Sequence, residues 1–101
     1  KDRESGPDQY IANMCDGALA GFKYFDLRAT KEISVAVKGR AEGTLYVRTS
    51  ENGKAVASIS VSPCREVKEF KAPLKVSGSR EALFFTFEGK GSFDFISFTL
   101  K

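Results

Sequence analysis

Carboxylates are the residues of this chain whose type could support catalysis. Glycoside hydrolysis needs two carboxyl groups that flank a cleft, one with a raised pKa. Asp16, Asp26, Glu88 and Asp94 are candidates, but any two of the 13 acidic residues could be paired in the same way. The acidic residues therefore predict no specific active site, and a solvated surface role accounts for most of them.

The absence of histidine from the sequence limits the available chemistry further. Without His, the chain has neither Ser-His-Asp nor Cys-His catalysis and lacks the commonest metal ligand. The two cysteines, Cys15 and Cys64, are too few for a structural zinc site. Their pairing is geometrically possible, but we favour free thiols because Cys is also an ordinary small buried residue. The chain is therefore not expected to be an enzyme.

The aromatic residues point instead to binding. The chain has 9 Phe, 3 Tyr and no Trp, and most of the Phe fall on strand faces and are expected in the core. Tyr10, Tyr24 and Tyr46 carry a polar tip and tolerate partial exposure. An exposed ring beside an amide or a carboxylate suits a sugar, whose apolar C–H face is rimmed by hydroxyls. The alternative for each Tyr is a sheet-edge position with its hydroxyl in water.

Charge and hydropathy exclude other classes of partner. The net charge is +3, and the basic residues are spread along the 101-residue chain among acidic ones, so a nucleic-acid footprint is not expected. No apolar run approaches the roughly 20 residues that span a bilayer, and no signal peptide is visible. Residues 1–9 have the composition of a linker, which leaves residues 10–101 as one domain.

The elements that would position these side chains are strands. Apolar residues alternate with polar ones over residues 33–37, 44–48, 57–62 and 83–88, and Asn52-Gly53 is a strong hairpin signal. Residues 22–27, 68–72 and 93–100 add further strands, the last with Ile96, Phe98 and Leu100 on one face. Only residues 11–19 offer a helical candidate, interrupted by a turn at Asp16-Gly17. Seven or eight short strands predict an all-β sandwich or barrel.

Two stretches resemble a known family. Residues 10–27 (YIANMCDGALAGFKYFDL) and 83–98 (LFFTFEGKGSFDFISF) are similar to segments of C-terminal domains of family 43 glycoside hydrolases. Those domains look like family 6 carbohydrate-binding modules, and the resemblance covers roughly residues 10–100. It implies a jelly-roll β-sandwich that binds plant cell-wall polysaccharide, such as xylan, beside a catalytic domain of the same chain.

The resemblance also implies a site. In the family, two aromatic rings grip a sugar, and an Asn from the last hairpin bonds its hydroxyls. The first ring matches Tyr10 and the Asn matches Asp94, while the second ring falls at Val67, with Phe70 then a buried strand residue. With Asn13 and Asp16 from the first stretch, the predicted carbohydrate-binding residues are Tyr10, Asn13, Asp16 and Asp94.

The family's structural calcium is the one metal that the resemblance raises. It is held partly by an acidic residue whose position matches Ile96, and an acidic N-terminal strand is reduced to Asp2 and Glu4. We therefore expect no metal and no cofactor. Two functions remain: a domain that binds xylan or arabinoxylan, or a structural domain that packs on the catalytic domain with little sugar affinity. The sequence leaves the compartment open, with a secreted or periplasmic location favoured if the parent enzyme is exported.

Overall fold

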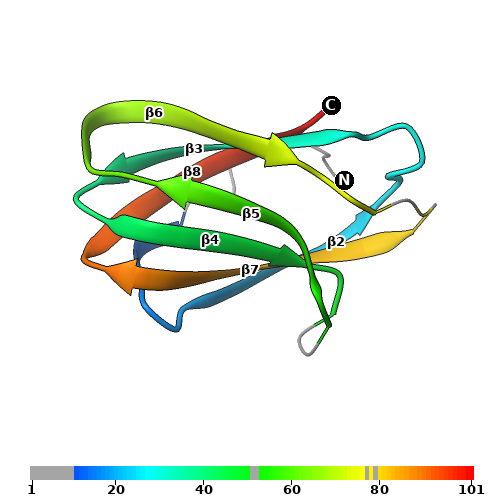
Figure 1. Cartoon of the computed structure of the whole chain (residues 1–101), viewed down its shortest axis with the longest axis horizontal. Coiled ribbons are helices and arrows are strands. Elements are labelled where there is room, and N and C mark those ends of the chain that lie inside the picture. Colours follow the sequence, from blue (N-terminus) through cyan, green and yellow to red (C-terminus); the bar gives the residue numbers. More distant parts are fainter. Residues whose placement is uncertain (1–10, 51–52, 77, 79) are drawn as a thin grey trace.

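The computed structural model describes residues 11–50, 53–76, 78 and 80–101. Within these residues the chain forms eight strands and no helix (Figure 1). The strands are β1 (Ile11–Cys15), β2 (Leu19–Phe25), β3 (Glu32–Gly39), β4 (Glu42–Arg48), β5 (Ala55–Val61), β6 (Cys64–Pro73), β7 (Glu81–Lys90) and β8 (Ser92–Leu100). The predicted linker over residues 1–9 lies outside the described residues. The described part contains no helix long and apolar enough to cross a membrane.

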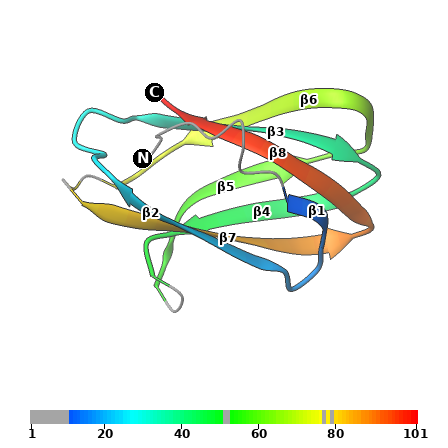
Figure 2. The ribbon, with the colours of Figure 1, turned by 180° about the vertical axis from the view of Figure 1, so that it is seen from behind.

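The strands pair into two antiparallel four-stranded sheets that face each other (Figures 1 and 2). One sheet has the order β1-β8-β3-β6 and the other β2-β7-β4-β5. The chain crosses from sheet to sheet at every connection except the β4–β5 hairpin, so neighbours within a sheet are mostly distant in sequence. This order is that of a jelly roll with two Greek keys. The predicted all-β, jelly-roll sandwich is confirmed.

Alternation along the strands creates the core between the sheets. Leu83, Phe85 and Phe87 of β7 are fully buried, and the side chains between them lie on the other face of the sheet. Phe85 packs edge to face on Phe95 of β8, with ring centroids 5.0 Å apart, and Phe87 packs in the same way on Phe93. These ring pairs join the two sheets with the geometry that aromatic side chains prefer. The expectation that most Phe are core residues is confirmed.

Two interpretations of the sequence, one of a helical candidate and one of a strand face, need correction at β-bulges. Residues 11–15, part of the only helical candidate, form β1, and its pairing with β8 shifts register before Met14. In the β3–β8 pair, Val37 of β3 pairs with Phe95 of β8, and the preceding Ala36 pairs with Ser97. Ile96 of β8 is therefore the extra residue of a bulge. Ile96 therefore does not share the core face of Phe98, because the bulge interrupts the period of two.

Short turns gather at one end of the sandwich, on the left in Figure 1. They connect β1 to β2, β3 to β4, β5 to β6 and β7 to β8. Gly17 and Gly91 occupy positive φ, at 85° and 79°, which glycine adopts at little cost. At the opposite end, β4 and β5 form the hairpin predicted from Asn52-Gly53. The end with the short turns, called the turn end below, carries the candidate site.

Candidate functional site

A depression of about 440 Å³ opens at the turn end. It lies where the end of β1, the β3–β4 turn and the start of β8 meet. Its lining consists of Asn13, Lys38, Gly39, Arg40, Gly91, Ser92, Phe93 and Asp94. The structure thus brings together two of the predicted carbohydrate-binding residues, Asn13 and Asp94, which are 81 positions apart in sequence. We call this depression the Asp94 depression.

Asn13 and Asp94 are joined by a hydrogen bond. The backbone N–H of Asn13 donates to Oδ1 of Asp94 over 3.1 Å. Asn13 has a φ of 58°, a left-handed conformation that Asn tolerates better than most residues, at the bulge in β1. The bulge takes this N–H out of the regular ladder, and the carboxylate supplies its acceptor. Asp94 therefore holds the edge strand in place, and this bond uses only one of its oxygens.

The strand register determines on which face of the sheet the side chain of Asp94 lies. Phe93 and Phe95 are buried on the core face of β8, so Asp94 between them lies on the solvent face. Lys38 of β3 is its cross-strand partner, which brings an ammonium group to the same face. Gly39 permits the close approach of β3 to β8, since a Cβ there would lie 2.7 Å from the Cα of Phe93. The depression thus combines a carboxylate with cationic hydrogen-bond donors.

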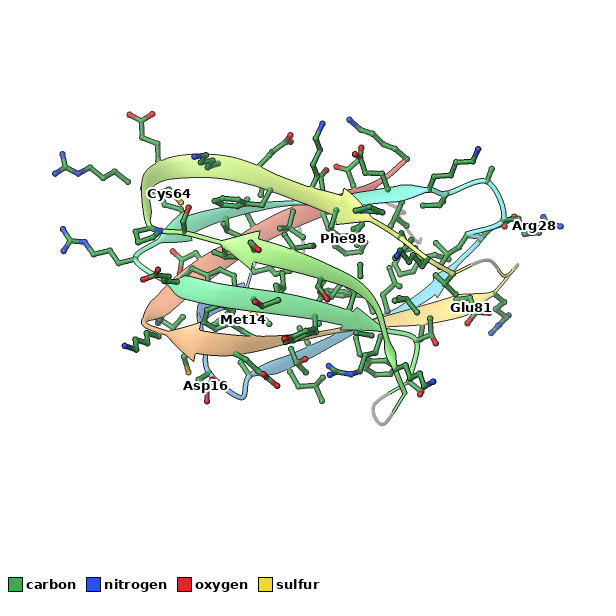
Figure 3. All side chains as sticks on the ribbon, in the orientation of Figure 1. Met14, Asp16, Arg28, Cys64, Glu81 and Phe98 are labelled. Carbon is green, nitrogen blue, oxygen red and sulfur yellow. The ribbon has the colours of Figure 1, made fainter. Side chains whose placement is uncertain are left out.

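Asp16, the third described residue of the predicted set, lies outside the Asp94 depression. Its Oδ1 accepts a hydrogen bond from the backbone N–H of Gly89 over 2.9 Å, and its side chain, labelled in Figure 3, does not line the Asp94 depression. This bond ties the β1–β2 turn to the end of β7. Asp16 is exposed, so its second oxygen is accessible, but the structure does not bring it together with Asn13 and Asp94.

The predicted aromatic positions are described in part. Tyr10 and the side chain of Tyr24 lie outside the described residues. Tyr46 is half-buried, with the guanidinium of Arg48 over its ring at 5.4 Å, in the sheet that does not contain Asp94. Arg48 is held by hydrogen bonds to Thr86 Oγ1 at 2.6 Å and the carbonyl oxygen of Gly53. Tyr46 is not at the edge of its sheet, as the alternative supposed, because β4 lies between β7 and β5.

The second aromatic position of the family falls on an exposed residue. Val67 is 55% exposed and lines a depression of about 340 Å³ with Cys64, Arg65, Glu66 and Lys68. Val37 pairs with Lys68 and Gly39 with Cys64, so Val67 lies in the irregular stretch of β6 that faces Lys38. Phe70 is half-buried against the core, beneath the ammonium group of Lys68 at 5.4 Å. It is thus only partly the buried residue that was expected.

The sequence reasoning did not single out Lys38 and Arg40. Nothing in the neighbouring sequence marks them as binding residues, since Lys38 simply comes after an alternating strand pattern and Arg40 comes after a glycine. They reach the Asp94 depression because the topology places β3 beside β8, a pairing that alternation alone does not reveal.

Asp26, one of the carboxylates considered as catalytic candidates, does not line the Asp94 depression. Asp26 belongs to the β2–β3 connection and is bonded to Arg28, which Figure 3 labels at the end of the sandwich opposite the turn end. Hydrogen bonds from the Arg28 guanidinium at 2.7 and 3.0 Å, and from its backbone N–H, lower the pKa of Asp26 to about 2. A carboxyl so acidic cannot serve as a general acid.

Two further features are the cysteines and the position that matches the family's calcium ligand. Cys15 and Cys64 are both free thiols, as expected. Cys64 is the first residue of β6, and its thiol donates to the carbonyl oxygen of Val37 at 3.6 Å. The described residues contain no group of three or more His, Cys, Asp or Glu side chains that could hold a metal ion. Ile96, at the family's calcium position, is the bulged residue of β8.

Comparison with known proteins shows which proteins the chain is similar to. No protein-family model matches the chain. The chain is 42% identical over 100 residues to a xylosidase/arabinosidase from Thermoclostridium stercorarium. The match covers 99% of the chain but only 21% of that protein, so the similar region is a small part of a larger enzyme.

Solved structures define the fold. A family 43 arabinoxylan arabinofuranohydrolase from Bacillus subtilis, in complex with cellotetraose, matches 91% of the chain and 21% of its own, with a TM-score of 0.81 and 19% identity. CsCBM6-3 from Clostridium stercorarium, in complex with cellobiose, matches 91% of the chain and 72% of its own, with a TM-score of 0.81 and 15% identity.

The chain has the fold of a family 6 carbohydrate-binding module. The resemblance seen in the sequence is therefore confirmed at the level of the fold. Such a module is a non-catalytic domain, in agreement with the expectation that this chain is not itself an enzyme. The match to one fifth of a xylosidase/arabinosidase also agrees with an accessory position in a glycoside hydrolase.

Proposed function

We propose that the chain is a non-catalytic carbohydrate-binding domain of a polysaccharide-degrading glycoside hydrolase, directed to xylan or arabinoxylan. The observation that carries the proposal is the Asp94 depression, in which residues from opposite ends of the sequence meet on a carbohydrate-binding fold. The similarity to a xylosidase/arabinosidase supports the choice of xylan.

The depression offers hydrogen bonds that suit sugar hydroxyls. One oxygen of Asp94 is engaged with Asn13, and the other is available to accept from a hydroxyl. Lys38, Arg40 and Ser92 supply donors on the same surface. A carboxylate cannot donate, unlike the Asn of the family, and Val67 offers no flat ring. Binding is therefore weaker than in a module with two rings and an Asn.

The partners follow from this role. They are plant cell-wall polysaccharide or its oligosaccharides, and a catalytic domain of the same chain. The binding surface does not involve nucleic acid, a membrane or a cofactor.

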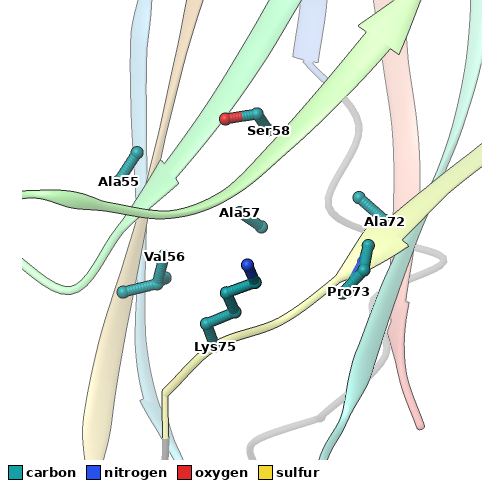
Figure 4. A pocket seen from close by; sticks show the side chains of 7 residues that line it. All are labelled: Ala55, Val56, Ala57, Ser58, Ala72, Pro73 and Lys75. Carbon is teal, nitrogen blue, oxygen red and sulfur yellow. The ribbon is translucent and has the colours of Figure 1, made fainter.

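A second candidate function is a structural domain that packs on the catalytic domain and binds little sugar. Two observations favour it. Val67 stands where the family has a ring, and an open groove of about 290 Å³ lies between β5 and β6 (Figure 4). Small and apolar residues dominate this groove, which is formed by residues 55–58 with Ala72, Pro73 and Lys75. Such a groove offers apolar surface that a neighbouring domain could cover.

One titration separates the two functions. Xylo- and cello-oligosaccharides are added to the isolated domain, and amide shifts are followed by NMR with and without calcium. Shifts that cluster on Asn13, Asp94 and the β3–β4 turn support the binding domain. No shifts at millimolar sugar would exclude it and favour the docking role.

A further inference from the structure

The turn end contains a second depression, next to the Asp94 depression, with a volume of about 460 Å³. Arg40, Pro63, Cys64 and Arg65 line it. Two of these four residues carry guanidinium groups, and none carries a carboxylate. We call it the arginine depression; Cys64 marks its position in Figure 3.

The arginine depression adjoins the two depressions on either side of it. It shares Arg40 with the Asp94 depression, and it shares Cys64 and Arg65 with the depression that Val67 lines. A ligand bound beside Asp94 that extends toward Val67 therefore passes the two guanidinium groups. The strand register agrees, because β3 lies between β8 and β6 in the sheet.

The cations of this surface are available for a ligand. Arg40, Arg65 and Lys38 are exposed, and none of them forms an ion pair with a carboxylate of the described residues. Asp94 and Glu66 are the acidic residues that line the flanking depressions, and Asp94 is already bonded to Asn13. Positive charge therefore predominates in the middle of the surface and is flanked by one carboxylate on each side.

This charge exceeds what a neutral sugar requires. Neutral hydroxyls are bound by amides, carboxylates and hydroxyl groups, whereas a guanidinium fork matches the two oxygens of a carboxylate. Within the proposed carbohydrate-binding function, we propose that the arginine depression binds the carboxylate of a uronic acid unit. The preferred ligand is then an acidic saccharide, with its neutral part in the Asp94 depression and its carboxylate between Arg40 and Arg65.

A carboxylate of this kind has two sources. It can be a glucuronic acid side group on a xylan chain, or it can belong to the main chain of a polygalacturonate. The experiment therefore uses three ligands of similar length: neutral xylotetraose, a xylo-oligosaccharide with one glucuronic acid group, and a galacturonate oligomer. Affinities are measured by calorimetry on the isolated domain at low and high salt.

For at least one of the acidic ligands, we expect binding at low salt roughly threefold to tenfold tighter than for xylotetraose. This is the range for one or two exposed ion pairs. High salt should remove most of the difference, because exposed charges are screened. The ligand that shows the preference identifies the source of the carboxylate.

Two variants locate the effect. Arg40→Gln and Arg65→Gln should each lower the ratio of acidic to neutral affinity, and together they should bring it close to one. Lys54→Gln removes an exposed cation from the β4–β5 hairpin at the opposite end and should leave the ratio unchanged. Thermal unfolding of each variant confirms that the fold is intact.

The outcomes distinguish this inference from the proposed function. If neutral and acidic ligands bind equally well, the inference is overturned and the binding function stands. If the acidic preference survives in the double variant, the carboxylate binds elsewhere and the inference is again overturned. If none of the three ligands binds, both proposals fail.

Discussion

Oδ1 of Asp94 accepts a hydrogen bond from the backbone N–H of Asn13, and this contact ties the edge strand β1 to the last hairpin. The same carboxylate is the residue we propose for contact with sugar. Structure and binding therefore depend on one side chain, and a suitable pair of substitutions can separate them.

Asp94→Ala removes both functions of the carboxylate. We expect the free energy of unfolding to fall by about 0.5–1.5 kcal/mol, the usual value of one hydrogen bond. Affinity for xylotetraose should fall at least threefold, because the hydroxyl acceptor is lost. Chemical denaturation measures the first quantity and calorimetry the second.

Asp94→Asn is the matched control. Its amide oxygen still accepts from the Asn13 N–H, and its amide nitrogen adds a donor for a hydroxyl. Stability should lie closer to wild type than to Asp94→Ala, and sugar should bind at least as tightly as to wild type. An alanine variant that binds sugar normally would place the site away from Asp94.

Val67→Trp tests the second ring position. Val67 is exposed, so a larger side chain at this site does not disturb the core. Stacking of an aromatic ring on a nucleic-acid base is worth about 1–3 kcal/mol. If stacking on a sugar is similar, affinity for xylotetraose should rise about tenfold.

Val67→Leu controls for added apolar volume without a flat ring, and it should leave affinity unchanged. A tryptophan variant with the affinity of wild type, in a protein whose binding depends on Asp94, would show that the sugar does not reach β6.

The strands could be predicted where alternation is regular. In β4 the buried Leu45 and Val47 alternate with partly exposed neighbours, and β7 repeats this pattern with Leu83, Phe85 and Phe87. A period of two is local information, so these core positions follow from the sequence alone.

Prediction from the sequence failed at positions where a bulge breaks the period of two along a strand. Asn13 in left-handed conformation and the extra residue Ile96 each shift a strand by one position, and neither has a distinctive local signal. The site was only half predictable for a related reason. The resemblance identified Asp94 and Asn13, whereas Arg40 and Arg65 come together only through long-range pairing of the strands.

Gly17 and Gly91 offer a test of turn geometry at the same end of the sandwich. Both have positive φ, but a Cβ at Gly17 meets nothing within 4 Å, while one at Gly91 would clash with the carbonyl oxygen of Arg40. Gly17→Ala should therefore cost about 1–2 kcal/mol for the backbone conformation alone. Gly91→Ala should cost more, because the steric clash adds to the free-energy cost of the backbone conformation.

Denaturant unfolding of both variants gives the two values. Equal costs would contradict the close approach of the β7–β8 turn to the β3–β4 turn, on which the shape of the Asp94 depression depends.

Asp26 and Arg28 make a pH-dependent contribution at the opposite end. The hydrogen bonds and charge of Arg28 lower the pKa of Asp26 from the ordinary 3.8 to about 2. A lowered folded-state pKa means that the unfolded state takes up the proton first as pH falls. The contribution to stability is therefore complete above pH 3.8, and it is lost as the pH falls from there toward 2.

An NMR titration of the side-chain carboxyl carbon should show a midpoint for Asp26 near pH 2 in the wild type. In Arg28→Gln the midpoint should move toward 3.8, and the stability difference between the two proteins should disappear below pH 2. The pair is exposed and screened by salt, so 0.5 M NaCl should reduce the shift in the wild type. An unchanged midpoint in Arg28→Gln would assign the low pKa to the backbone N–H of residue 28 and not to the guanidinium group.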